Sequence, residues 1–100
     1  MSQEQRPAYR PMIRDLPQAE RPRERLRHYG ASSLSNTELA AILLRTGLKG
    51  ENVLEMATRL LARFGGLPGL ARAGFEELCQ QRGISEAKAS HLLAALELGR

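Results

Sequence analysis

The stretch LCQQRGISEAKA, residues 78–89, decides the fold. An apolar helical segment leads into Arg82-Gly83-Ile84-Ser85, and a second helix begins directly after this tight connection. Gly83 permits a positive φ and a close approach of the backbone to a ligand, while Ile84 is placed to plug a core between the two helices. The pattern predicts a helix-hairpin-helix motif, in which two helices are joined by a glycine-centred turn.

Such a turn offers a place for a phosphate group. The backbone N–H groups from Ser85 to Lys88 would be unpaired at the start of the second helix, where the helix dipole also favours an anion. Lys88 adds a mobile positive charge in the first turn. A site of this kind holds the sugar-phosphate backbone rather than base edges, so it predicts DNA binding with little sequence preference.

A purely structural interpretation competes with this one. In it Gly83 closes a helical hairpin, Ile84 fills the core and Ser85 is an ordinary helix cap. Glu86 favours the structural interpretation, because its carboxylate would repel a phosphate while it stabilises the start of a helix.

A second glycine turn, TGLKG at residues 46–50, carries Lys49 and can grip a second phosphate. It repeats the first turn at an offset of 36 residues, so that Gly47 coincides with Gly83. The alternative is a plain glycine-rich loop whose neighbouring N–H groups are already satisfied by Asn52. The predicted DNA-binding residues of the two turns are Arg82, Gly83, Ile84, Ser85, Lys88, Gly47, Lys49 and Gly50.

On either side of these turns, the sequence predicts helices joined by short connections. Residues 67–70 are predicted to be one of the connections. Pro22 and Gly30 bracket a charged helix, since proline suits the first helical turn and glycine the position after the last. Ser35 and Asn52 open two further helices, each followed three residues later by a glutamate that completes a capping box. The prediction is an all-α fold: a small bundle of about five helices with one or two helix-hairpin-helix motifs and no strand. The residues expected to face its core are Leu39, Ile42, Leu43, Val53, Leu54, Ala57, Leu60, Leu61, Phe64, Phe75, Leu78, Cys79, Ala89, Leu92, Leu93 and Leu96.

Length and composition limit the class of protein. The 100 residues are 42% hydrophobic and 26% charged, which is typical of one small soluble domain. No apolar run is long enough to cross a bilayer, and one cysteine with two histidines makes a structural metal site implausible. The net charge of +4 fits nucleic acid or an acidic surface as partner. We expect a cytoplasmic chain with a flexible, proline-containing N-terminal arm over residues 1–20 and a helical domain over residues 21–100.

The first predicted helix is rich in arginine. Arg21, Arg25 and His28 share helical spacing, which makes them a possible phosphate-facing stripe. The alternative is a solvated helix whose arginines pair with Glu20 and Glu24.

Side chains suited to catalysis are not grouped in this sequence. Cys79 lies at an apolar helical position, which is typical of a core residue, and His91 has no second group placed to work with it. The motifs of zinc proteases, P-loop nucleotidases and serine hydrolases are absent. We expect no enzymatic activity, no cofactor, no metal and no small-molecule substrate for these residues.

Two segments of the sequence resemble the RadC family of bacterial proteins, also called UPF0758. The first contains RPRERL at residues 21–26 and LSNTELAAILLRTG at residues 34–47, and the second runs over residues 77–98. Together they span about residues 13–100. The resemblance implies a helix-hairpin-helix domain related to the C-terminal fold of RuvA and to endonuclease III-like glycosylases, in a protein historically named for DNA repair.

The resemblance also implies a larger C-terminal domain of the JAB/MPN metallopeptidase type, whose zinc-binding HxH…D signature does not occur in these residues. The chain therefore looks like an excised N-terminal domain. Where the family turn reads Gly-Ile-Gly, this sequence has Gly83-Ile84-Ser85, and the serine limits how closely backbone can approach a phosphate. The catalytic lysine and aspartate of the related glycosylases have no counterpart here.

These observations lead to one main functional prediction and one alternative. The main prediction is a non-enzymatic, sequence-nonspecific DNA-binding module of a RadC-like repair protein, with the DNA phosphate backbone as its partner. The alternative is a protein-interaction or regulatory module for the missing metallopeptidase-like domain, with no membrane contact in either case.

Overall fold

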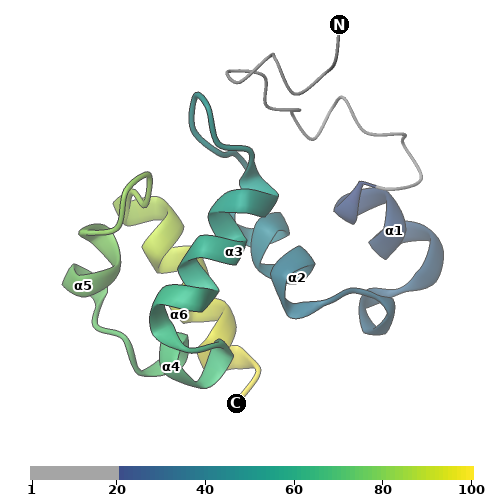
Figure 1. Cartoon of the computed structure of the whole chain (residues 1–100). Helices are drawn as coiled ribbons and strands as arrows, with labels where there is room; N and C mark the ends of the chain where they lie inside the picture. Colours follow the sequence, from purple (N-terminus) through teal and green to yellow (C-terminus); the bar gives the residue numbers. More distant parts are fainter. Residues whose placement is uncertain (1–20) are drawn as a thin grey trace, which may run out of the picture.

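The computed structural model describes residues 21–100, which form six α-helices and one 3-10 turn (Figure 1). Within this part of the chain the only extended pairing is an isolated bridge between Leu48 and Glu51. The predicted flexible arm lies outside the described residues. The elements in chain order are α1 (Pro22–Tyr29), η4 (Ala31–Ser33), α2 (Asn36–Leu44), α3 (Val53–Phe64), α4 (Leu67–Arg72), α5 (Phe75–Cys79) and α6 (Glu86–Leu98).

The helix boundaries that were predicted from capping residues are confirmed. Helix α1 starts at Pro22, and the chain leaves it at Gly30, which has φ +87°. Ser35 and Asn52 each cap a helix, and the glutamate three residues on closes a capping box in both cases. Short-range side-chain chemistry of this kind acts within one helical turn, so the sequence is sufficient to place it.

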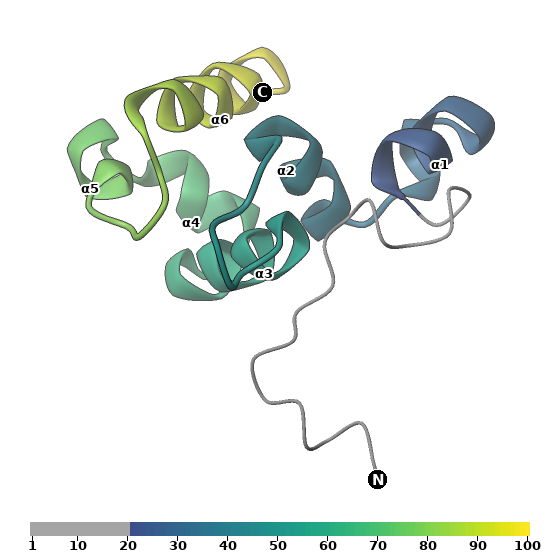
Figure 2. The same cartoon turned by 90° about the horizontal axis from the view of Figure 1, so that it is seen from above.

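The hydrophobic core lies where α2, α3 and α6 meet, and α4 and α5 cover its remaining sides (Figures 1 and 2). In both views α1 lies beside α2, on the side away from α5. Burying each of the larger side chains contributes about 1.5–3 kcal/mol to folding. The largest fully buried ones are Leu44, Met56, Leu60, Leu70, Leu78 and Leu92.

The predicted inner face of α2 is wrong by about one residue. Ala40, Ala41 and Leu44 are buried, whereas the expected core residues of this helix are only partly covered. Almost every side chain between residues 39 and 44 is apolar, so hydrophobic periodicity does not select a face there. Packing selects it instead, because two alanines let neighbouring helices approach closely.

Helix α4 was predicted as a connection, and that prediction is wrong. Pro68 and Gly69 disfavour a helix interior, but Pro68 stands in the first turn, where its missing N–H costs nothing. Gly69 is required for packing, since a Cβ there would lie 1.6 Å from the carbonyl oxygen of Phe64. Helix α4 therefore folds directly onto the last turn of α3 and buries Leu70.

Phe75 was expected inside the core, but it is 36% exposed. It opens α5, a five-residue helix that buries only Leu78. A helix this short presents one covered position, and Leu78 occupies it.

Candidate nucleic-acid interface

The two glycine turns lie at the same end of the bundle, as Figure 1 shows for the α2–α3 hairpin and the α5–α6 turn. Gly83 has φ +83°, as its turn requires. A Cβ on Gly83 would lie 2.7 Å from the methyl carbon of Met56 and 2.8 Å from a methyl carbon of Leu48. The side of Gly83 that lacks a side chain is therefore filled by α3 and by the other turn, and the glycine allows the two turns to pack together.

A network of charged side chains also joins the two turns. The Arg59 guanidinium donates to both carboxylate oxygens of Glu51, at 2.9 and 2.8 Å, and to the carbonyl oxygen of Arg82, at 2.8 Å. Glu51 belongs to the first turn and Arg82 to the second, while Arg59 projects from α3. The hydrogen bonds to Glu51 raise the pKa of Arg59 above its ordinary value. The network fixes the relative position of the turns.

Lys88 is bound to protein atoms rather than mobile. Its ammonium nitrogen donates to the carbonyl oxygens of Leu44 and Thr46, at 2.6 Å each, and to the Thr46 hydroxyl at 3.2 Å. These three acceptors match the three donors of an ammonium group. Partial burial and the nearby charge of Arg45 lower the pKa of Lys88. The expectation of a free, phosphate-facing charge at this position is wrong.

The N–H groups at the start of α6 are only partly paired. The Ser85 hydroxyl accepts from the Lys88 N–H at 3.2 Å, so Ser85 is a helix cap. No atom of residues 21–100 accepts a hydrogen bond from the N–H groups of Glu86 and Ala87. These two donors remain for an anion, although the Glu86 carboxylate shares their position on the first turn.

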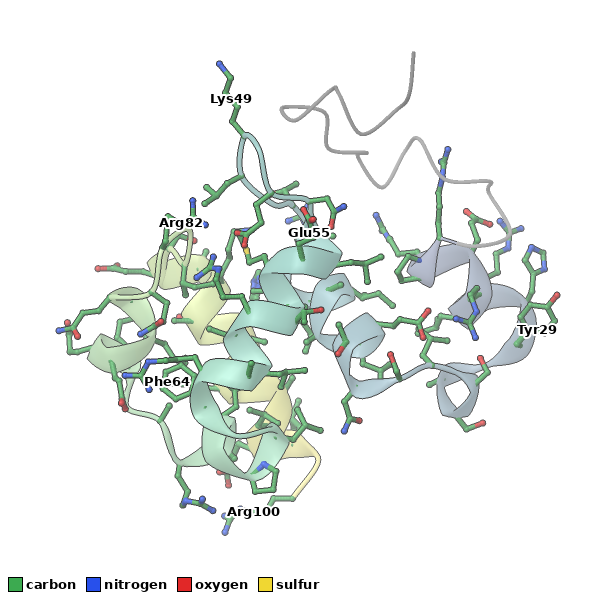
Figure 3. All side chains as sticks on the ribbon, in the orientation of Figure 1. Tyr29, Lys49, Glu55, Phe64, Arg82 and Arg100 are labelled. Atoms are coloured by element: carbon green, nitrogen blue, oxygen red, sulfur yellow. The ribbon has the colours of Figure 1, made fainter. Side chains whose placement is uncertain are left out.

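Each of the two turns carries one exposed cation. Lys49 lies at the tip of the α2–α3 hairpin and points away from the helices in Figure 3. It forms a two-residue turn with Gly50, which has φ +85°. Arg82 keeps a side chain that is 67% exposed, with Glu51 at 3.7 Å.

The structure therefore brings all eight predicted residues to one end of the fold but gives them different surroundings. Ile84 is 5% exposed and plugs the core as expected. Gly47 allows a tight crossing, because a Cβ there would lie 2.2 Å from the carbonyl oxygen of Glu51. Sequence reasoning missed Arg59 and Glu51, since their pairing depends on the path of the hairpin and on no local pattern.

Two residues of the possible phosphate-facing stripe on α1, Arg25 and His28, lie next to carboxylates. Arg25 pairs with Glu38 on α2 and donates to the Ser33 carbonyl oxygen at 3.2 Å. His28 lies 3.9 Å from Glu24. Glu24 is thus placed beside His28 rather than paired with an arginine as expected, and Arg25 has its carboxylate on another helix. The proposed partner Glu20 lies outside the described residues.

The remaining chemistry-bearing side chains of residues 21–100 are isolated. Cys79 is partly buried, and burial raises the pKa of its thiol. His91 is exposed on α6. Within the same range no three histidine, cysteine or acidic side chains are grouped to hold a metal ion. None of the described helices is long and apolar enough to cross a membrane.

Comparison with known proteins identifies the family of the chain. The family model described as UPF0758 N-terminal matches residues 13–90. The chain belongs to the UPF0758 family. Among its relatives are UPF0758 proteins of Roseiflexus sp. (strain RS-1), 56% identical over 92 residues, and Desulfitobacterium hafniense (strain DSM 10664 / DCB-2), 60% identical over 88 residues. These alignments cover 92% and 88% of the chain.

The chain spans about 40% of the length of these UPF0758 relatives, with 40% and 39% of them covered. The predicted family resemblance is thereby confirmed. No solved structure shows significant similarity to the chain.

Proposed function

We propose that this UPF0758 domain is a non-enzymatic DNA-binding module that holds the phosphate backbone at the end formed by its two glycine turns. The observation that carries the proposal is the joining of the turns by Arg59 and Glu51. It places Lys49, Arg82 and the unpaired N–H groups of α6 on one end of the molecule.

The chemistry of this end suits phosphate rather than base edges. Lys49 and Arg82 are exposed cations, and the N–H groups of Glu86 and Ala87 lie at the positive end of a helix. Contacts to phosphate carry no sequence information, so the binding is sequence-nonspecific. Lys88 supports the site by fixing the start of α6.

The experiment is a titration of fluorescein-labelled duplex DNA, followed by anisotropy at several salt concentrations. Two to four phosphate contacts predict a slope of about −2 to −4 for log K against log salt, from about −0.9 per contact. The double variant K49Q/R82Q removes two of these contacts and should reduce the magnitude of the slope by up to about 2.

The matched control is R72Q/R100Q, which removes two exposed charges elsewhere, Arg100 lying at the opposite end in Figure 3. The control should lose affinity only slightly. If K49Q/R82Q and the control bind equally, the turns are not the contact surface. An absence of binding at 50 mM salt and high micromolar protein contradicts DNA binding by this domain.

A further inference from the structure

A groove of about 530 Å³ lies between the start of α1 and the residues that flank the α2–α3 hairpin, where α2 ends and α3 begins. Its floor is apolar and its rim is charged. The floor consists of Pro22, Ala41, Ile42 and Val53, and the rim of Arg21, Arg23, Glu24, Arg27 and Arg45.

Three rim arginines form no ion pair within the described part of the chain. Arg23, Arg27 and Arg45 are exposed, and no carboxylate of residues 21–100 forms an ion pair with them. Most other arginines of this part of the chain are engaged: Arg25, Arg59, Arg82 and Arg100 pair with carboxylates, and Arg63 lies over the Phe64 ring. Arg72 is the exception. Uncompensated positive charge is thus concentrated at this groove.

The backbone is strained at Arg45, one of the residues that line the groove. Arg45 has φ +73° and ψ −54°, and the Thr46 N–H donates to the Leu44 carbonyl oxygen at 2.8 Å. This is the rare γ-turn, which non-glycine residues seldom adopt. Arg45 is the sole non-glycine residue of the described range with a positive φ. Such strain is typically maintained at functional positions, and here Lys88 grips the carbonyl groups on both sides of Arg45.

We propose that this groove binds an acidic segment of a partner protein, with one apolar side chain seated on the floor between carboxylates that meet Arg23, Arg27 and Arg45. A guanidinium binds a carboxylate through two parallel hydrogen bonds. An apolar anchor in a pocket with a charged rim is the usual centre of a protein interface. Nucleic acid fits less well, because a phosphate backbone offers nothing to the apolar floor.

The test uses three fluorescein-labelled peptides and the whole chain. GDDLLDDG carries both features, GDDSSDDG lacks the apolar pair, and GNNLLNNG lacks the charge. Anisotropy at 50 mM salt should show GDDLLDDG binding at least about tenfold more tightly than either of the others, since each removes one kind of contact. Equal binding of GDDLLDDG and GDDSSDDG overturns the apolar anchor and with it the proposal.

Variants then locate the site. R23Q/R27Q should weaken GDDLLDDG about tenfold, and R72Q/R100Q should leave it within twofold, with circular dichroism confirming that both variants melt as the parent does. Equal loss in the two variants would indicate nonspecific charge attraction and would overturn the proposal. The proposal would also be overturned, in favour of nucleic acid, by a single-stranded DNA 12-mer that binds the parent more tightly than GDDLLDDG does and does not bind R23Q/R27Q.

Discussion

The ammonium nitrogen of Lys88 lies 2.6 Å from the carbonyl oxygen of Leu44, and this contact joins the first turn of α6 to the last residue of α2. Carbonyl groups at a helix C-terminus lack partners within the helix and need donors from elsewhere. Lys88 supplies one across 44 residues of sequence. It thereby connects the two helix-turn-helix halves at the end where both turns lie.

Replacing Lys88 with alanine is therefore expected to destabilise the fold. Hydrogen bonds from a charged donor contribute about 1.5–3 kcal/mol, and the partial exposure of this side chain places the expected loss of unfolding free energy at about 1–2 kcal/mol. Urea denaturation measures it. The control is Lys49→Ala, which removes an exposed lysine and should change stability by less than about 0.5 kcal/mol. Equal midpoints for the two variants would show that the contact adds nothing to the fold.

Gly83→Ala should destabilise more than Gly65→Ala. Both glycines have a positive φ, at +83° and +78°, so both substitutions incur a backbone cost of about 1–2 kcal/mol. Only at Gly83 would the new Cβ also meet side chains, those of Met56 and Leu48, at 2.7–2.9 Å. We expect an additional loss of about 1–3 kcal/mol for this overpacking. Equal melting temperatures would mean that the turns do not pack as tightly as the structure has them.

The sequence was sufficient for features that act within a turn of helix. Ser35, Asn52 and Ser85 placed three helix starts correctly, because a capping side chain and its backbone partner are three residues apart. Gly83 was likewise recognised as a positive-φ position. These signals are local, and tertiary packing did not override them.

The surroundings of the candidate site were beyond local reasoning. The sequence placed Lys88 on the first turn of a helix, where an exposed charge is the simplest expectation, but its acceptors come from the other half of the chain. The bridge from Arg59 to Glu51 and the Arg82 carbonyl group likewise exists only once the two turns are side by side. Long-range pairs of this kind leave no periodic signal.

Glu38→Gln should make the domain less sensitive to acid. The hydrogen bond from the Ser35 N–H, assisted by Arg25, lowers the pKa of Glu38 below its ordinary value of 4.5. A carboxyl group with a lowered pKa contributes stability above its unfolded-state pKa and loses it as pH falls through the folded-state pKa. Glutamine retains a capping side chain but does not titrate. The unfolding free energy obtained from urea denaturation should therefore fall more for the parent between pH 6 and pH 3, by less than about 1 kcal/mol for this half-buried pair.

Identical acid profiles for the parent and Glu38→Gln would contradict the role of this carboxylate. The variant Glu97→Gln provides the comparison, since Glu97 pairs with the exposed Arg100 at the end of α6. Its profile should follow that of the parent.

Glu51→Gln is expected to change stability and DNA binding in opposite directions. The carboxylate of Glu51 accepts two hydrogen bonds from Arg59 and lies 3.7 Å from Arg82. A neutral amide accepts only one of these bonds, so the two turns should be held less firmly and unfolding free energy should fall by about 1–2 kcal/mol. The same change removes the negative charge beside Arg82, which strengthens attraction of phosphate and should make the salt slope steeper by up to about 0.9.

Glu97→Gln removes the same charge at the other end of the fold and should alter neither stability nor the salt slope appreciably. Both measurements are made on one preparation, by urea denaturation and by duplex anisotropy. Lower stability without a gain in affinity would support the structural role of the bridge between Arg59 and Glu51. It would contradict DNA binding at the glycine-turn end.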